Sequence, residues 1–460
     1  MSTKLKANAL SFFESIIMGV AGSAPGFSIA VAIASLIGAV GVVSPSALII
    51  FAIPMLGIAI AYKGLARKMP NAGAAYEWTS QSFGKFFGYF SGWALLIAAL
   101  VFMVTGSVPL GTATIDLFNP ALASNVLLTT SIGAIWFIAI GIVLITGIGL
   151  TSKIQVVMSS IELIILAVIA IMAFIHAGSA GTINHFSWSW FGFNYPPGSF
   201  AASALIVVFL YWGWDVTSNL SEETNDIPPD TAGNGGFYSV FITIGFFVAF
   251  TLSALFLFSL KDAGGFSDNL IYHIAIQAGL GPVGGFAASI ALILSSIATL
   301  ETTMLQFSRT LFAMGRDRAM PTTFGVVQPK TQTPVRTMFL LLAVGLVLIF
   351  LSSFMSSVGK ILSDSVNAIA VQVCYYYGLA GLVCAWSYRN SLSSSVGTFL
   401  IYAVFPFLSA LALILLGLYA LSTFDTLTKI VGIGGLVIGI LFYRMSGYKM
   451  TGMLAANAAE

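Results

Sequence analysis

Three carboxylic acids lie deep inside long apolar stretches of the sequence. Glu162, Asp215 and Glu301 are each far from the ends of such a stretch, and no Lys or Arg lies at a similar depth. An ionised carboxylate surrounded by hydrocarbon is costly, so residues of this kind face a wet cavity, take up protons or bind cations. The alternative is that each acid is neutral and hydrogen-bonded to a neighbouring helix. The chemistry that these residues favour is proton or cation binding.

Glu162 and Glu301 are similar in depth. Counting from the same side, Glu162 lies about 14 Å and Glu301 about 20 Å along their predicted helices, at 1.5 Å per residue. The two could therefore face one cavity, and two carboxylates in a cavity of low dielectric favour holding a proton. This makes them the candidate coupling residues.

The first apolar stretch contains a break, "VAGSAPGFSI" at residues 20–29. Where a membrane helix unwinds, its backbone groups must line a cavity or bind something. Free amides here would hold an anion such as a carboxylate, although Pro25 removes one donor, which leaves room for a simple amine. The candidate binding residues are Gly22, Ser23, Ala24, Gly26 and Phe27.

A second break lies in the sixth stretch, "FLYWGWDVTSNLSEE" at residues 209–223. Its carbonyls would hold a cation such as an ammonium group, and an aromatic side chain there could close over the ligand or stack on its charge. One of Tyr211, Trp212 and Trp214 is expected to act as such a gate, with "VCYYYG" at 373–378 as a weaker candidate. The candidate binding residues are Phe209, Tyr211, Trp212, Gly213, Trp214 and Asp215.

The elements that position these residues are membrane helices. Of the 460 residues, 58% are hydrophobic and only 7% are charged, and the mean hydropathy is +0.99, which indicates an all-α integral membrane protein. We predict one membrane domain, 1–460, with twelve spans. They are 10–37, 46–66, 84–112, 125–148, 153–177, 199–221, 236–260, 283–314, 336–356, 364–388, 395–421 and 428–445.

The positive charges predict the orientation. Three of the 18 Lys and Arg residues, Lys261, Lys360 and Lys429, fall on one side of these spans. The other side holds Lys4, Lys6, Lys63, Arg67, Lys68, Lys85, Lys153, Arg309, Arg316, Arg318, Lys330, Arg336, Arg389, Arg444 and Lys449. Cytoplasmic loops are rich in Lys and Arg, so both termini are expected in the cytoplasm, with the protein in the plasma membrane.

The two breaks are five helices apart. Corresponding interruptions in two halves of a chain predict an inverted repeat, here 10–177 and 199–388, followed by two further helices at 395–445. The alternative is a pair of ordinary kinks, since Gly and Pro are common in membrane helices.

Other chemistries find little support. Cys374 and Cys384 are ten residues apart on one predicted helix, too far for a mutual disulfide, and the three His residues lack metal-ligand spacing. The net charge of +2 predicts no nucleic-acid partner. An intramembrane enzyme is disfavoured, because the Ser-x-x-Lys spacing of Ser357 and Lys360 lies in a short turn without a second catalytic group.

Three motifs carry a family resemblance. They are "MPNAGAAYEWTSQSFGKFFGYFSGW" from Met69, "WGWDVTSNLSEETNDIPPD" from Trp212 and "SRTLFAMGRDRAMPTTFGVVQPKTQTP" from Ser308. In this order they resemble the segments entering helix three, ending helix six and leaving helix eight in the amino acid, polyamine and organocation (APC) transporter superfamily. The resemblance implies a 5+5 inverted repeat with helices one and six broken, and a permease of the bacterial or archaeal type.

The resemblance also implies an activity. It points to secondary active transport of an amino acid or related amine by alternating access, with no cofactor and with H⁺ as the expected coupling ion, Na⁺ being the alternative. In this family helices five and eight pack beside helix one near a cation site, and the position of Glu162 is often a lysine linked to proton coupling. A polyamine or organic-cation carrier, an amino acid exchanger and a channel remain alternatives, and the expected partners are a small-molecule substrate and the lipid bilayer. The sequence leaves the oligomeric state open.

The acids after the second break suggest an inner gate. Glu222, Glu223, Asp226 and Asp230 lie on the same predicted side as Arg316 and Arg318. They could form ion pairs that open and close during a cycle. A solvated loop is the alternative, since exposed ion pairs contribute only ~0–1 kcal/mol.

Overall fold

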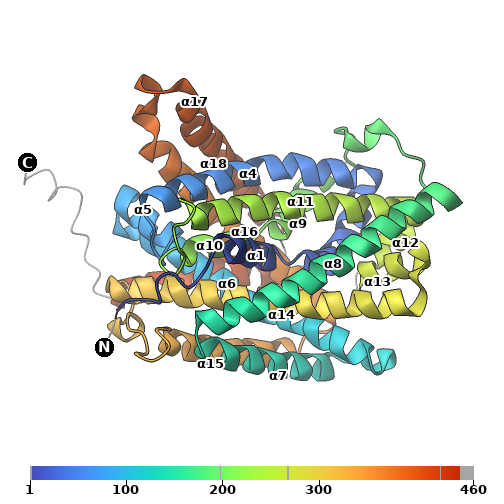
Figure 1. Cartoon of the computed structure of the whole chain (residues 1–460), viewed down its shortest axis with the longest axis horizontal. Coiled ribbons are helices and arrows are strands. Elements are labelled where there is room, and N and C mark those ends of the chain that lie inside the picture. The colour runs from blue at the N-terminus through green and yellow to red at the C-terminus, as the bar shows by residue number, and fades with distance from the viewer. Residues whose placement is uncertain (1–2, 197, 267–268, 425, 446–460) are drawn as a thin grey trace, which may run out of the picture.

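The described part of the chain is an all-helical bundle (Figure 1). The computed structural model describes residues 3–196, 198–266, 269–424 and 426–445, and Lys449 lies outside them. Ten long helices cross the bundle in one piece. They are α4 (Ser44–Lys68), α6 (Lys85–Asp116), α7 (Val126–Ile145), α8 (Ile148–Ala180), α11 (Thr231–Leu257), α14 (Gly281–Arg316), α15 (Val335–Ser352), α16 (Val358–Ser387), α18 (Phe405–Thr423) and α19 (Thr426–Met445).

Two further passes are broken, which brings the passes in the described residues to twelve, as predicted. The first consists of α1 (Phe12–Ser23), α2 (Pro25–Ser28), a π-helical turn at Ile29–Ile33 and α3 (Ala34–Val40). The sixth consists of α9 (Ser199–Leu210) and α10 (Val216–Asn219). The correspondence of 10–177 with 199–388 as repeats remains a prediction.

Short elements either connect these passes or, like α17 (Val396–Phe399) and the turn at Leu400–Val404, lead directly into one of them. The α-helical ones are α5 (Ala75–Phe83), α12 (Leu260–Gly265), α13 (Leu270–Ala275) and α17. π-Helical turns occupy Ile276–Leu280 and Leu400–Val404. 3₁₀ turns occupy Gly41–Val43, Pro120–Leu122, Trp188–Phe191, Thr322–Phe324 and Arg389–Ser393.

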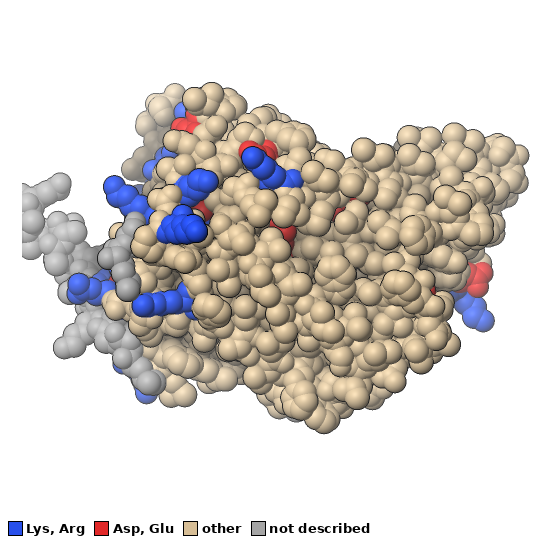
Figure 2. All heavy atoms as spheres, turned by 60° about the horizontal axis from the view of Figure 1, so that its bottom comes forward, with Lys and Arg blue, Asp and Glu red and all other residues tan. Residues whose placement is uncertain are grey.

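Positive charge marks one end of the bundle. In Figure 2 the Lys and Arg side chains crowd toward the end that holds the N-terminus, and few lie at the other end. We call the first the basic end, where the last turns of α4 and α14 hold Arg67 and Arg316, and the second the opposite end, where Lys261 follows α11 and Lys360 lies in the first turn of α16.

Helix α14 lies at the centre of the packing. Every residue from Leu300 to Gly315 is buried, and α14 packs against α6, α8, α1 and α2. The peripheral helices instead expose apolar side chains, for example Ile142, Ile164 and Leu415, as expected of a lipid-facing surface. The residues that could hold a ligand are therefore collected around a buried helix.

Small residues allow the close helix contacts. A Cβ on Gly111 of α6 would lie 2.1 Å from the carbonyl oxygen of Thr129 on α7, and one on Gly133 would lie 2.4 Å from that of Ser107. Without a hydrophobic force between helices in lipid, such close backbone approach is a main source of packing energy.

The first break is narrower than the sequence analysis expected. Only Ala24 leaves the helical conformation, with φ 46° and ψ 69°, while Gly22 and Ser23 end α1 and Gly26 and Phe27 belong to α2. The helix restarts at once because the fixed φ of Pro25 suits a first helical position.

The second break is wider and touches the first. Helix α9 ends at Leu210 and α10 begins at Val216, and Gly213 between them has φ +104°. A Cβ on Gly213 would lie 2.2 Å from the carbonyl oxygen of Gly22, and one on Gly22 would lie 2.1 Å from that of Gly213. The two broken helices therefore meet backbone to backbone.

We predict that Gly213→Ala destabilises the folded protein. The new methyl group meets the Gly22 backbone in a conformation that L residues rarely adopt, and strain of either kind costs roughly 1–3 kcal/mol. The measurement is the apparent melting temperature of purified protein in detergent. Gly178→Ala is the control, because a Cβ at Gly178 meets no atom within 4 Å among the described residues. Equal melting temperatures for the two variants would contradict the close contact.

Candidate functional site

The amides after the first break are bound by the protein's own side chains. The Gly26 amide donates to Glu162 Oε1 at 2.9 Å, and the Phe27 amide donates to Ser295 Oγ at 2.9 Å. The Ala24 amide donates back to the carbonyls of Val20 and Ala21. We expected amides here to be free for an anion, but in this structure the Glu162 carboxylate takes that place.

Glu162 of α8 thus joins three helices. Its side chain is buried, accepts from the Gly26 amide and is also hydrogen-bonded to the Ser295 hydroxyl of α14. In the described part of the chain no Lys or Arg side chain pairs with it. A proton or a small cation is therefore the available counter-charge when this carboxylate is ionised.

Carbonyls of the first break are also bound by side chains. The Gly22 carbonyl accepts from Thr299 Oγ1 at 3.1 Å, and the Ser23 carbonyl accepts from Ser28 Oγ at 3.0 Å. Unwinding is tolerated in a membrane because such groups replace the lost helical partners.

Asp215 sits at the end of the second break, fully buried among neutral donors. Its carboxylate accepts from Gln306 Nε2 at 2.7 Å, Tyr377 Oη at 2.9 Å and Tyr376 Oη at 3.1 Å. Trp212 Nε1 donates in turn to Tyr376 Oη. Helices α14 and α16 therefore hold an acid of the sixth pass through hydrogen bonds alone, with no cation among the described residues to neutralise it.

Glu301 is not joined to this cluster. It is buried, and its Oε1 has no hydrogen-bond partner within the described residues. It lies six residues beyond Ser295, which is about 9 Å along α14 and on another side of that helix at 100° per residue. Glu162 and Glu301 are therefore not brought into contact.

A small central cavity lies between the two breaks. Its volume is about 10 Å³, room for about one water molecule. Phe102 of α6 closes it, with ring centroids 6.0 Å from Phe27, 6.5 Å from Phe209 and 5.4 Å from Trp212. The lining residues are Gly22, Ser23, Ala24, Phe27, Ser28, Phe102, Phe209, Trp212 and Thr299.

Two of the three aromatic gate candidates do not line the central cavity. Tyr211 donates from its hydroxyl to the Leu48 carbonyl, and Trp214 packs against Tyr62 and Tyr377. Of the three aromatic gate candidates, Trp212 alone lines the central cavity in this structure.

Sequence reasoning missed several polar partners on α14. Ser295, Thr299, Gln306 and Arg309 recur at intervals of three to seven residues in an apolar run, so they lie on one face of a helix. That periodicity was the available signal. The missed aromatic residue Phe102 gave no such signal, because it is one of 37 phenylalanines.

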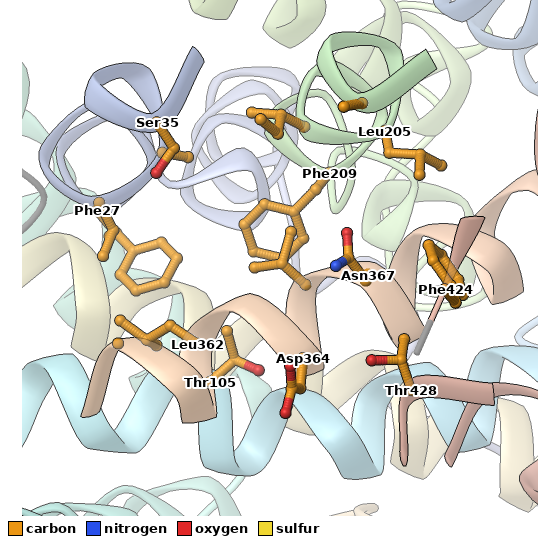
Figure 3. Close-up of a pocket in the computed structure, with 16 residues that line it drawn as sticks. Phe27, Ser35, Thr105, Leu205, Phe209, Leu362, Asp364, Asn367, Phe424 and Thr428 are labelled. Atoms are coloured by element: carbon orange, nitrogen blue, oxygen red, sulfur yellow. The ribbon is translucent and has the colours of Figure 1, made fainter. Parts of the chain in front are cut away.

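A much larger cavity opens toward the opposite end. Its volume is about 570 Å³, and Figure 3 shows Phe27 and Phe209 among the residues that line it. We call it the vestibule. Because both phenylalanines also line the central cavity, they separate the two spaces.

The basic end is sealed by ion pairs. Arg309 makes two hydrogen bonds of 2.8 Å to Glu223, with both side chains buried, and Arg316 makes two of 2.9 and 3.0 Å to Glu222. Glu223 also accepts, through its carbonyl, the amides of Ala9 and Leu10. The chain segments before the first pass and after the sixth are thereby tied to α14.

These pairs differ in part from the predicted inner gate. Arg316 does pair with Glu222, but the partner of Glu223 is Arg309, because it lies on the inward face of α14. Asp230 lies 3.6 Å from Arg67. Beside this seal, burial raises the pKa of Asp317 to about 6, and the neighbouring Glu77 carboxylate adds to the rise.

Comparison with known proteins agrees with this architecture. The family model described as amino acid permease matches residues 10–445. The low-affinity putrescine importer PlaP of Escherichia coli (strain K12) is 27% identical over 325 residues, 66% of each chain. The branched-chain amino acid permease BcaP of Lactococcus lactis subsp. cremoris (strain MG1363) is 28% identical over 287 residues, 58% of this chain and 60% of that one.

A plant relative matches at a similar level. The vacuolar cationic amino acid transporter 4 of Arabidopsis thaliana is 24% identical over 351 residues, 69% of this chain. The alignments span 55–66% of the length of these three relatives. The match of the family model over nearly the whole chain, with two broken helices that meet around a buried α14, shows that the protein belongs to the amino acid permease family of the APC superfamily.

Proposed function

We propose that this protein is a secondary transporter that carries an amino acid or a related amine across the plasma membrane by alternating access, coupled to H⁺. The proposal rests on one observation. The two helix breaks meet inside the bundle, between a basic end closed by ion pairs and an opposite end that opens into the vestibule. Ion pairs of Glu222 and Glu223 close the basic end, while the vestibule reaches Phe27 and Phe209 from the other. Such an arrangement is expected of a carrier that faces one side at a time.

The orientation follows from charge. The basic end is the cytoplasmic one under the positive-inside rule, so both termini are cytoplasmic and the vestibule faces outward. The ion-paired seal is then an inner gate, and entry from outside requires Phe27 and Phe209 to separate.

Glu162 is the proposed coupling residue. Its carboxylate holds the Gly26 amide and the Ser295 hydroxyl, so its protonation changes the contacts that fix the first break against α14. A charged carboxylate is favoured when water reaches it and a neutral one when the site is dry. Na⁺ coupling and pure exchange are the competing proposals.

An organic cation is the second candidate substrate. It is favoured by Asp215, a buried acid whose partners in the described residues are all neutral. Two of the three relatives described above are likewise a putrescine importer and a cationic amino acid transporter.

The general test is counterflow in proteoliposomes. Vesicles loaded with unlabelled putrescine, L-lysine or L-leucine should accumulate the labelled form of the transported compound, with saturation. Uptake without saturation or counterflow would indicate a channel and would overturn the proposal.

For coupling, we predict that Glu162→Gln leaves substrate exchange intact but abolishes substrate accumulation driven by a pH gradient. Gln keeps an acceptor for the Gly26 amide but mimics the protonated acid permanently. Exchange between two loaded compartments should stay within about twofold of wild type, whereas accumulation driven by an imposed pH gradient should be lost. Both are measured as labelled substrate in vesicles.

Glu301→Gln is the matched control for this experiment. It removes a second buried carboxyl, whose Oε1 has no hydrogen-bond partner among the described residues, so coupling should persist. If Glu162→Gln still concentrates substrate in response to a pH gradient, Glu162 is not the proton carrier.

For substrate charge, we predict that Asp215→Asn weakens putrescine binding at least about tenfold, about 1.4 kcal/mol, and L-leucine binding far less. The substitution keeps the side-chain shape and removes the charge. Dissociation constants are measured by titration calorimetry, with Tyr377→Phe as a control that removes one hydrogen bond and keeps the charge. Equal losses for both ligands would mean that Asp215 is structural.

A further inference from the structure

We propose that the vestibule contains a binding site for the primary ammonium group of an organic cation, in which Asp364 supplies the counter-charge and the Lys360 ammonium occupies the site until the ligand displaces it. The inference rests on the proposed transport function and names its substrate class as a diamine or a cationic amino acid.

The cavity has the size and walls of a ligand site. Its volume of about 570 Å³ is within the range of small-molecule pockets, and most of its lining is apolar. Figure 3 shows Thr105 of α6 and Thr428 of α19 on the same side of the cavity as Asp364, with Phe27 and Phe209 across from them. Convergent polar groups in an apolar cavity fix the orientation of a ligand.

Asp364 gives the vestibule its charge. Among the described residues that line the cavity it is the one that carries a formal charge. Its side chain is 15% exposed, and its Oδ2 lies 2.9 Å from Lys360 Nζ. A carboxylate in such a setting needs a cationic partner, whereas the ammonium and carboxylate of a neutral amino acid balance each other.

Lys360 is suited to be a displaceable partner. It lies one helical turn before Asp364 on α16, and its side chain is 44% exposed. A lysine four residues before an acid is the less favourable order for a helical ion pair, and lysine carries a compact ammonium on a flexible stem. A primary amine has the same charged group, so it replaces the lysine without leaving the carboxylate unpaired.

The position of the vestibule site suits binding that precedes entry of the ligand into the central cavity. Asp364 and Tyr376 are twelve residues apart on α16, which is about 18 Å of helix. Tyr376 donates to Asp215 beside the central cavity. A cation held at Asp364 therefore lies on the outward side of Phe27 and Phe209, with a second buried carboxylate beyond them.

The test is calorimetric titration of putrescine into the purified full chain, with L-leucine as the neutral comparison. Asp364→Asn should weaken putrescine binding at least about tenfold, and Lys360→Met should strengthen it several-fold because the internal competitor is gone. If L-leucine binds, its dissociation constant should change less than twofold in both variants. The gain in affinity of Lys360→Met cannot arise from misfolding.

Asp262→Asn is the matched control. It removes an acid from the same end of the protein, on α12, outside the vestibule, and should leave the putrescine constant unchanged. Asp364→Asn is also added to the Asp215→Asn protein, and the two are compared. Because both then lack the central acid, any loss of putrescine affinity between them belongs to the vestibule.

The outcomes are distinct. Equal putrescine affinities of the Asp215→Asn protein with and without Asp364→Asn, or no putrescine binding by wild type at millimolar concentration, overturn the site. Unchanged or weaker putrescine binding in Lys360→Met overturns the displacement. Failure of the transport proposal is seen separately, as absence of counterflow for every compound in vesicles, whatever the binding constants are.

Discussion

The contact between the Gly22 and Gly213 backbones is the constraint on which the rest of the structure depends. Two helices can be broken at the same depth in a membrane only if the freed backbone groups are satisfied, and here each break helps to bury the other. The remaining partners come from Glu162, Ser295 and Thr299. A movement of the first broken helix would therefore break or shift its hydrogen bonds to α8 and α14.

Both buried acids at the breaks are held by hydrogen bonds and not by cations. Glu162 accepts from a backbone amide and is bonded to a hydroxyl, and Asp215 accepts from two tyrosines and a glutamine. Neutral donors stabilise a carboxylate without cancelling its charge, so a proton or an organic cation can still be bound. By contrast, Arg309 and Glu223 neutralise each other, and removing either would leave a buried charge unpaired. The ion pairs at the basic end and the acids at the breaks thus differ in how their charge is balanced.

The sequence predicts the fold of this protein more fully than the details of its candidate site. Apolar runs of membrane length determined the twelve passes, and the Gly and Pro residues within two of them located the breaks, because both signals depend on local composition. The candidate positions Gly22, Ser23, Ala24, Phe27, Phe209 and Trp212 do line one central cavity. The width of each break was not predictable, since it depends on single conformations such as that of Ala24.

Only the tertiary structure decided which groups meet. The sequence placed Glu162 at a suitable depth but could not show that its partner is the Gly26 amide, or that Glu301 faces another side of α14. It marked the acids after the second break, yet the pairing of Glu223 with Arg309 depends on the rotation of α14 about its axis. Hydropathy fixes where a helix crosses the membrane, whereas the direction in which each side chain points is set by packing against helices far away in the chain.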